Sequence, residues 1–240
     1  MFESIPRFLR GAHPTDSAAQ IPAKFLLAMM KLYTYFRSSA AYRVRIAMHL
    51  KGLDYDPSFI HLAKGAHNEV AYRDINPAQL VPALIDEGHL LTQSLAIIEY
   101  LDEVHPDNPL LPAAPLARAR VRALALLIAC DIHPIDNLRV LKYLNRQLKV
   151  SEEQKSAWYR HWVEDGLAKL EAMLRDGGSG KFCHGDTPSL ADCCLVPQVA
   201  NGQRFNCDFG QVPTVMRIFD ECNRIDAFRK AAPANQPDAE

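Results

Sequence analysis

The alternation of hydrophobic and polar positions divides the chain into a first part with strands and helices and a second part with helices alone. In the first part, aromatic and β-branched residues favour strands, and Glu87-Gly88 is a hairpin signal between two of them. The expected elements are a strand at Lys31–Phe36, a helix at Ser39–Lys51 ended by Gly52, a strand at Ser58–Leu62, a short irregular helix at His67–Arg73, strands at Ala83–Asp86 and His89–Thr92, and a helix at Ser94–Val104. Because a helix joins the first two strands, we expect them to run parallel.

Residues 105–114 separate the two parts. This segment contains Pro106, Pro109 and Pro112 and lacks a helical pattern, which is typical of a linker. Beyond it, helices are expected at Leu116–Leu148, Glu152–Arg175, Ser189–Arg204 and Thr214–Asn223. Ser189 and Asp192 form a capping-box pattern, which we interpret as structural. The pattern predicts an α/β domain at residues 30–104, an all-helical domain at residues 115–240, and a ligand cleft between them.

Composition narrows the possible partners. Of the 240 residues, 48% are hydrophobic and 23% are charged, which is typical of a globular protein. The net charge of −1 gives no basis for binding nucleic acid or an anionic membrane surface. No apolar run approaches the roughly 20 residues that a membrane-spanning helix needs. We therefore expect neither nucleic acid nor a membrane as a partner. Residues 1–29 lack periodicity, so we expect a flexible N-terminal extension.

The cysteines indicate a reducing environment. Six cysteines in a chain of this length do not make a disulfide scaffold, so we expect a cytoplasmic location. The spacing of Cys183-His184 and Cys193-Cys194 matches no zinc pattern, and we expect no metal site.

A pair of hydroxyl side chains stands between the first expected strand and the first expected helix. Ser38-Ser39 can meet an anion there, because the first N–H groups of a helix lack partners within it. Taken alone, such a pair is more often an ordinary helix cap. However, Leu80-Val81-Pro82-Ala83 and Gln93-Ser94-Leu95-Ala96 are also placed at the starts of elements. Together the three sites predict a single pocket for a small acidic thiol peptide.

The run Tyr35–Ala47, YFRSSAAYRVRIA, resembles the signature of the zeta-class glutathione transferases, the family of the maleylacetoacetate isomerases. The match continues through Asn76-Pro77, Leu80–Leu84, Gln93–Leu101, Asp131–Pro134, Asn137-Leu138, Gly185-Asp186, Leu195–Val199 and Gln236–Asp238. The resemblance implies the glutathione transferase fold, a thioredoxin-like domain plus a helical domain, in a homodimer. It also implies that glutathione is the cofactor. The implied reaction is cis–trans isomerisation of maleylacetoacetate to fumarylacetoacetate, in tyrosine and phenylalanine catabolism.

The resemblance also implies roles for individual residues. Ser38 matches the catalytic serine, whose hydroxyl would donate to the glutathione sulfur, and Ser39 would be a second donor. The helix N-terminus would add positive potential that favours a thiolate. Arg37 and Arg204 would bind a substrate carboxylate, which suits the planar guanidinium. The glutathione-binding set would also include Ala40, Ala41, Tyr42, Arg43, His67, Val81, Pro82, Gln93, Ser94, His133, Asn137, Leu138 and Arg139.

Some of these expectations are specific. The Val81-Pro82 peptide bond is expected to be cis, and Ser94 is expected to bind the γ-glutamyl carboxylate at a helix N-terminus. His67 would meet the glycyl carboxylate, although an exposed loop histidine is an equal alternative. His133 and Asn137 are spaced i, i+4 and are expected on one helical face. Ala40 departs from the animal-type pattern, which commonly has a cysteine there.

Several other functions remain open. The same glutathione chemistry would serve a maleylpyruvate isomerase of the gentisate pathway, and His133 with Arg139 resembles some bacterial enzymes of that type. A zeta-type glutathione transferase acting on small α-halo acids is a second alternative. A glutathione-binding protein without catalysis is a third, from a different class. A thiol redox enzyme is disfavoured, because the turn carries serines and Ala40 rather than a cysteine.

Overall fold

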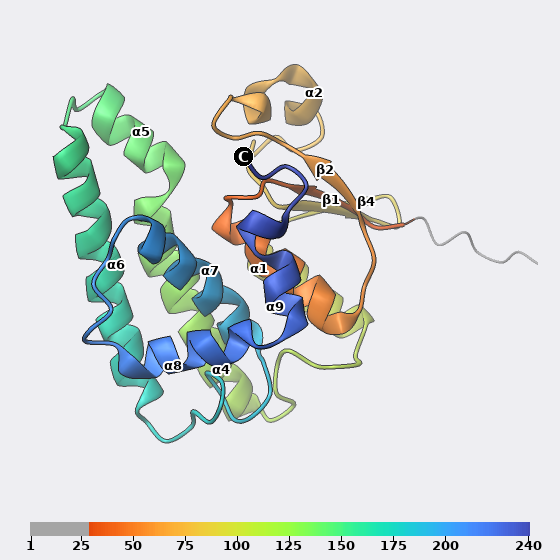
Figure 1. The fold of residues 1–240 in the computed structure, drawn as a ribbon. Helices are drawn as coiled ribbons and strands as arrows, with labels where there is room; N and C mark the ends of the chain where they lie inside the picture. Colours follow the sequence, from red (N-terminus) through yellow and green to blue (C-terminus); the bar gives the residue numbers. More distant parts are fainter. Residues whose placement is uncertain (1–28) are drawn as a thin grey trace, which may run out of the picture.

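The computed structural model describes residues 29–240, so the expected N-terminal extension lies outside the described residues except for Met29. A four-stranded sheet forms the first part of the molecule (Figure 1). Its strands are β1 (Lys31–Thr34), β2 (Asp56–Phe59), β3 (Ala83–Asp86) and β4 (His89–Thr92), in the order β2-β1-β3-β4. Strands β1 and β2 are parallel, and β3 and β4 form an antiparallel hairpin, which confirms both expectations.

The bounds expected for the second strand were wrong. The strand was expected at Ser58–Leu62 and instead covers Asp56–Phe59. Its pairing with β1 begins where the Asp56 N–H donates to the Met30 carbonyl at 2.8 Å, and the Ile60 N–H donates to the Thr34 carbonyl at its far end. Pro57 lies within this strand, which fits the edge position of β2 because an edge strand leaves some N–H groups unpaired.

Two helices cover the sheet and carry the start of the site. Helix α1 (Ser39–Lys51) and helix α3 (Ser94–Val104) have the predicted bounds, and Gly52 ends α1 with a left-handed φ of 66°. The short helix η1 (Ala66–Asn68) and helix α2 (Val70–Arg73) confirm the irregular helix expected nearby. Ile46 of α1, Ile97 of α3 and Leu32 of β1 are fully or almost fully buried between these layers.

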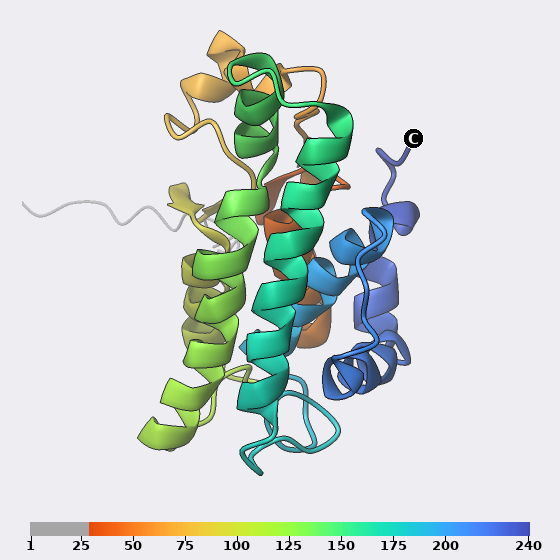
Figure 2. The same ribbon diagram turned by 90° about the vertical axis from the view of Figure 1, so that its left-hand side faces the viewer.

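The second part is helical. Its elements are α4 (Pro115–Leu126), the π-helical segment η2 (Leu127–Ile132), the 3-10 turn η3 (His133–Asp136), α5 (Leu138–Arg146), α6 (Glu152–Leu174), α7 (Leu190–Arg204), α8 (Pro213–Asn223), α9 (Asp226–Ala231) and the 3-10 turn η4 (Pro233–Asn235). Figure 2 shows α4 and α6 as a long upright pair, with α8 and α9 to their right. None of the helices within residues 29–240 is long and apolar enough to cross a membrane.

The single helix expected at Leu116–Leu148 was wrong, because the chain breaks at His133-Pro134. Proline has no N–H for the helical ladder, and its ring clashes with the preceding turn. The helix restarts at Asn137, whose side-chain oxygen accepts the Arg139 N–H at 3.1 Å. The break places Leu138 and Arg139, the first residues of α5, in the lining of the cavity described below.

Helix α7 passes through the centre of the molecule and packs against α1. Its start confirms the capping box, since the Asp192 carboxylate accepts the Ser189 N–H at 2.8 Å and the Ser189 hydroxyl at 2.7 Å. Asp192 also accepts the Cys183 N–H at 2.9 Å. Because Asp192 is fully buried, these hydrogen bonds stabilise a carboxyl group that has no contact with water.

Candidate active site

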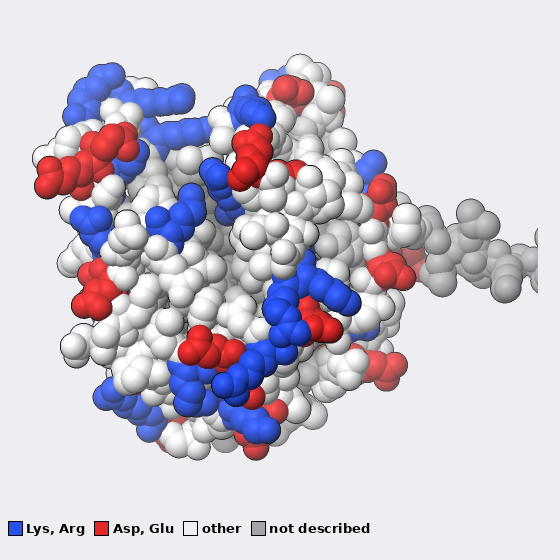
Figure 3. Space-filling model, in the orientation of Figure 1, with Lys and Arg blue, Asp and Glu red and all other residues white. Residues whose placement is uncertain are grey.

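A cavity of about 340 Å³ lies where the sheet and α1 meet the helical part. In the space-filling view the surface is hollowed between α5 and α2, and lysine and arginine side chains border the hollow (Figure 3). The lining includes Arg37, Arg43, Arg139 and Arg204, and among the described lining residues Asp136 is the one carboxylic acid. The cavity therefore attracts anions.

Ser38 lies at the point where β1 turns into α1. It is the N-cap residue, and its Oγ accepts the Ala41 N–H at 3.2 Å. A hydroxyl that accepts one hydrogen bond still has its proton to donate. Ser38 is only partly buried and lines the cavity, so its O–H is available to a ligand beside the positive end of the helix.

Ser39 follows in the first turn of α1 and is buried, with 4% of its surface exposed. Its hydroxyl accepts a short hydrogen bond from the side-chain amide of Asn201 on α7. The Asn201 carbonyl oxygen in turn lies 3.4 Å from Nη2 of Arg204. This chain of contacts joins the serine turn to an arginine of the helical part.

Arg45, two turns into α1, holds the serine turn in place from behind. Its guanidinium donates to the Tyr35 carbonyl at 3.3 Å and to the Phe36 carbonyl at 3.1 Å. It also donates to the Ala231 carbonyl at the end of α9 at 3.1 Å. Complete burial lowers the pKa of Arg45 to about 10, which leaves it charged at neutral pH. Nη1 of Arg45 also donates to the Thr34 hydroxyl at 2.9 Å. Sequence reasoning missed this residue because most of its partners are backbone carbonyls.

Arg43 and Ser94 meet at the start of α3. Nη1 of Arg43 donates to Oγ of Ser94 at 3.3 Å, and both side chains are buried. Nε and Nη2 of Arg43 are also buried and have no hydrogen-bond partner in the described part of the chain. Gln93, just before, has a φ of 69°, a costly conformation for a residue other than glycine. Unpaired guanidinium donors beside a helix N-terminus fit a carboxylate of a bound peptide such as glutathione.

The remaining wall on the sheet side comes from the segment before β3. The Val81-Pro82 peptide bond is cis, as expected, and both residues line the cavity. The Leu80 carbonyl accepts hydrogen bonds from the Tyr72 hydroxyl at 2.6 Å and from the Asn76 amide at 2.8 Å. These bonds fix the segment on the side opposite the helical wall.

His133 and Asn137 lie together on the helical side, although no single helix contains both. Asn137 Nδ2 and His133 Nε2 are 3.3 Å apart. Burial, followed by the charges of Arg43 and Arg139, lowers the pKa of His133 to about 3. His133 is therefore a neutral imidazole at physiological pH. Leu138 and Arg139 complete this edge of the cavity.

Three of the expected site residues lie outside the cavity lining. Ala41 contributes its N–H to the cap on Ser38. Tyr42 faces the core, where its hydroxyl donates to the Phe228 carbonyl at 3.2 Å. His67 lies in η1 and is not among the lining residues, and burial with the charge of Lys142 lowers its pKa.

Sequence reasoning missed several lining residues, among them Tyr35, Asp136, Tyr159, Gln198, Asn201 and Phe205. The Tyr159 and Phe205 rings stack with their centroids 3.7 Å apart, and the Arg204 guanidinium lies 4.7 Å from the Phe205 centroid. Apart from Tyr35, which precedes α1, the missed residues come from η3, α6 and α7 with its C-cap Phe205, and only tertiary packing brings these elements to one cavity. Within residues 29–240 no group of three or more potential metal ligands occurs.

Comparison with known proteins defines the class to which this fold and cavity belong. The glutathione S-transferase N-terminal domain family matches residues 28–103, and the glutathione S-transferase C-terminal domain family matches residues 153–201. The molecule therefore has the glutathione transferase fold, with an N-terminal thioredoxin-like βαβαββα domain and a helical C-terminal domain.

Individual relatives narrow the class. A probable maleylacetoacetate isomerase of Vibrio cholerae is 50% identical over 87% of this chain and 97% of its own length. A maleylpyruvate isomerase of a Ralstonia species is 46% identical over 88% of this chain and 100% of its own length. The chain belongs to the zeta-class glutathione transferases, the family of the maleylacetoacetate isomerases.

Solved structures agree with this membership. The holo structure of a zeta-class maleylpyruvate isomerase has a TM-score of 0.85 at 46% identity and covers 88% of this chain and 100% of its own. A maleylacetoacetate isomerase from Methylobacterium extorquens, with bound malonate and glutathione, has a TM-score of 0.85 at 42% identity. It covers 88% of this chain and 99% of its own.

Proposed function

We propose that this protein is a glutathione-dependent cis–trans isomerase that converts maleylacetoacetate into fumarylacetoacetate in tyrosine and phenylalanine catabolism. One observation carries the proposal. A single cavity combines the Ser38 turn at the N-terminus of α1 with the guanidinium groups of Arg37 and Arg204. The maleylacetoacetate isomerases among the relatives, at up to 50% identity over most of both chains, support the choice of reaction.

The sheet side of the cavity is the proposed glutathione subsite. Arg43, Ser94 and the N-terminus of α3 would hold one carboxylate of the tripeptide, because two buried Arg43 donors lack protein partners. Val81 and Pro82 would border its cysteinyl part. Bound glutathione in the active site of a related maleylacetoacetate isomerase supports this assignment.

When bound, glutathione would supply a thiol nucleophile for addition to, and later departure from, the conjugated cis double bond. Ser38 would donate its hydroxyl proton toward that sulfur, since the Ser38 oxygen already accepts the Ala41 N–H. The unpaired N–H groups at the start of α1 would add positive potential. Both effects stabilise a thiolate relative to a thiol. His133 would remain neutral and would act only as a hydrogen-bonding partner of Asn137.

Arginines would position the other reactant. Arg37 and Arg204 line the cavity and are exposed, so both would be accessible to a dianionic acid from solvent. Their guanidinium groups would bind its carboxylates and stabilise the carbonyl oxygen that gains negative charge during addition. Arg204 is oriented by its contacts with Asn201 and the Phe205 ring.

Maleylpyruvate is the second candidate substrate. A maleylpyruvate isomerase is 46% identical to this chain and is covered over its whole length, so overall similarity does not separate the two acids. Both contain a carboxylate on a cis double bond conjugated to a carbonyl, and both suit the same nucleophile and arginines.

The assignment is tested by measuring glutathione-dependent isomerisation of both acids side by side. We expect fast turnover of maleylacetoacetate, and Ser38→Ala should reduce it by about 100-fold or more while glutathione still binds. Ser156→Ala, on α6 and outside the cavity lining, is the matched control and should leave the rate unchanged. Glutathione binding without turnover of either acid would overturn the isomerase proposal and favour a conjugating transferase or a binding protein.

Three further proposals concern the setting of the enzyme. We propose a homodimer, which is supported by exposed apolar residues on neighbouring elements, Leu90 of β4, Val104 of α3, and Leu116 and Leu126 of α4.

We propose a cytoplasmic location, supported by six cysteines that are all unpaired in the described chain. We also keep the division into residues 30–104, a linker at 105–114 and residues 115–240. The match of the N-terminal domain family, which ends at residue 103, supports the first boundary.

A further inference from the structure

Asp136 is the last residue of η3, and it lines the cavity with only 7% of its surface exposed. Both of its carboxyl oxygens are buried, and neither has a hydrogen-bond partner among the described residues. Buried carboxyl groups are normally satisfied by several donors, because an unpartnered charge in a dry site is costly. Asp192 and Asp102 follow that rule, with backbone N–H donors at 2.8 Å. Asp136 is therefore unusual in this molecule.

The surroundings of Asp136 do not supply a compensating charge. No salt bridge of Asp136 occurs within the described residues, although arginines line the same cavity. Burial alone raises its pKa, to about 7. The group thus lies close to the balance between a neutral acid and a carboxylate at physiological pH.

We propose that Asp136 receives the dianionic substrate as a neutral carboxylic acid and donates a hydrogen bond to it, so that binding of the acid takes up a proton. The inference rests on the proposed function, since it assigns a role within the same cavity. The physical reason is that the bound anion and the charge on Asp136 repel each other, so each disfavours the other equally. A bound anion beside Asp136 disfavours the carboxylate, and a carboxylate at Asp136 disfavours the anion. The proton comes from solvent and returns to it when the product leaves, so the reaction consumes none.

Placement supports this role on the substrate side of the cavity. Asp136 lines the cavity together with Tyr159, which stacks on Phe205, and the Arg204 guanidinium lies over the same Phe205 ring. Asp136 therefore belongs to the helical wall that carries the proposed carboxylate-binding arginine. The proposed glutathione subsite at Arg43 and Ser94 lies on α1 and α3.

The other ionisable groups around Asp136 do not titrate near neutral pH. On the same turn, burial lowers the pKa of His133 to about 3. Burial raises the pKa of Tyr159 on α6, and it raises the pKa of Cys207, three residues beyond the end of α7, to about 12. The other charged groups that line the cavity near this wall are the guanidinium groups of Arg43, Arg139 and Arg204. Proton uptake between about pH 6 and 9 is therefore assigned to Asp136.

The test uses malonate as the probe, without glutathione, so that no cofactor thiol titrates. Isothermal titration calorimetry in two buffers of different ionisation enthalpy gives the protons taken up per malonate bound. We expect the wild type to take up nearly one proton at about pH 8.5, and its Kd for malonate to rise about tenfold per pH unit above the pKa. Asp136→Asn, whose amide imitates the neutral acid, should take up none and should bind malonate with little pH dependence. Asp131→Asn, at an exposed position outside the lining, should behave as the wild type.

A second measurement does not depend on the folding of the variant. Infrared difference spectra of the wild type across the same pH range should show the carbonyl stretch of a protonated carboxylic acid, retained to higher pH with malonate bound. Equal proton uptake in the wild type and Asp136→Asn, or no acid band that malonate stabilises, would overturn the inference. Isomerase turnover without malonate binding would also overturn it and leave the proposed function standing. Proton-linked malonate binding without turnover of either acid would support it and overturn the proposed function instead.

Discussion

The side-chain amide of Asn201 on α7 donates a hydrogen bond to the hydroxyl of Ser39 in the first turn of α1. The contact crosses from the helical domain to the thioredoxin-like domain, inside the cavity that contains Ser38. Because Asn201 also accepts from Arg204 at 3.4 Å, one amide positions both the serine turn and an arginine. The relative placement of the two proposed subsites therefore depends on Asn201.

Replacing Asn201 should impair catalysis more than folding. Asn201→Ala removes the donor to Ser39 and the acceptor for Arg204, and we expect kcat/KM to fall by about tenfold. Asn201→Asp is the informative companion, because a carboxylate keeps the acceptor for Arg204 but cannot donate to Ser39. Steady-state kinetics with thermal unfolding separate the two effects. Unchanged kcat/KM in both variants would show that the bridge does not position the site.

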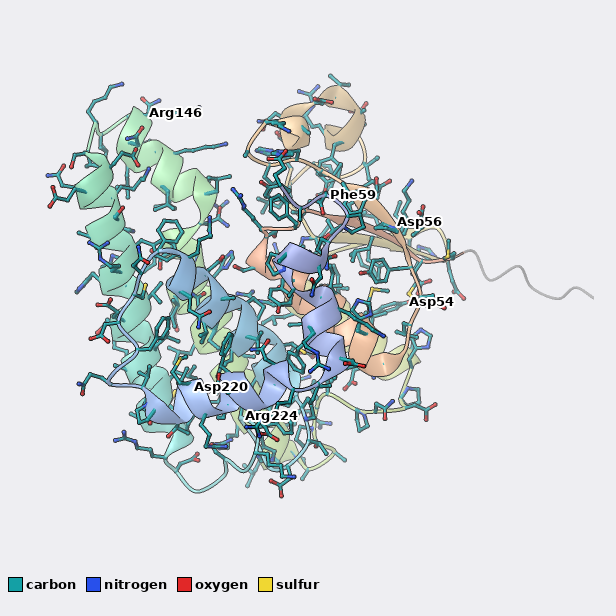
Figure 4. The ribbon with its side chains drawn as sticks, in the orientation of Figure 1. Asp54, Asp56, Phe59, Arg146, Asp220 and Arg224 are labelled. Atoms are coloured by element: carbon teal, nitrogen blue, oxygen red, sulfur yellow. The ribbon has the colours of Figure 1, made fainter. Side chains whose placement is uncertain are left out.

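Substitution of Arg204 tests how the substrate carboxylate is bound. Arg204→Lys keeps the charge but loses the planar pair of donors, so we expect KM for the substrate to rise by about tenfold with glutathione affinity unchanged. The control is Arg224→Ala, at the C-cap of α8 (Figure 4) and not among the residues that line the cavity. Among the described residues, the ion-pair partner of Arg224 is Glu221, at 2.6 Å, and loss of Arg224 should leave KM unchanged. An unchanged KM in Arg204→Lys would contradict a bidentate contact between Arg204 and a substrate carboxylate.

The part of the site that sequence predicted is the part encoded locally. Ser38 caps α1, Ser94 begins α3, and the Val81-Pro82 bond precedes β3, each within a few residues of a recognisable boundary. Capping and turn chemistry act over three or four residues, so their residues stand together in the chain. The same locality explains why α1, α3 and the β3–β4 hairpin had the expected bounds.

The helical wall of the site could not be predicted in this way. Asp136, Tyr159 and Asn201 reach the cavity from η3, α6 and α7, and only tertiary packing brings them together. Asp136 also depends on the break at Pro134, a signal that was present in the sequence but was interpreted as the interior of one helix. Arg45 could not be predicted for a different reason. It donates to the Tyr35 and Phe36 backbone carbonyls, and because every residue has a backbone carbonyl, such partners leave no mark in the sequence.

Gly166 of α6 provides a test of how the helical wall is held. A Cβ added there would lie 2.4 Å from Cγ1 and 2.6 Å from Cδ1 of Ile132, the residue before His133. We expect Gly166→Ala to lower the free energy of unfolding by about 1–3 kcal/mol through this overlap. It should also reduce turnover by displacing His133. Chemical denaturation and steady-state kinetics measure the two effects.

The matched control for Gly166→Ala shortens Ile132, the side chain that the added Cβ would overlap. Ile132→Ala should itself be destabilising, because it removes a buried side chain with 2% of its surface exposed. In the double variant, the alanine at position 166 gains the space that Ile132 leaves, so the two effects should not add. Strict additivity would show that the close approach of Gly166 to Ile132 does not constrain the wall.

His133 predicts how stability responds to acid. Its pKa is lowered to about 3 in the folded protein, by burial first and then by Arg43 and Arg139, whereas an unfolded histidine has a pKa of about 6.5. Between these values the unfolded chain binds more protons than the folded one, so stability falls as the pH decreases. From about pH 7 to 5 this one group should remove up to about 2 kcal/mol of the free energy of unfolding.

The measurement is urea denaturation of the wild type and His133→Gln at several pH values between about 7 and 5. Glutamine cannot be protonated, so the variant should lose less stability than the wild type over this range, although it starts from a lower value because the packing of His133 is lost. The comparison isolates His133 because every other titrating group is common to both proteins. Parallel loss of stability in the two proteins would mean that His133 is protonated in the folded state as readily as in the unfolded chain. The conclusion that His133 is a neutral imidazole in the folded protein would then be wrong.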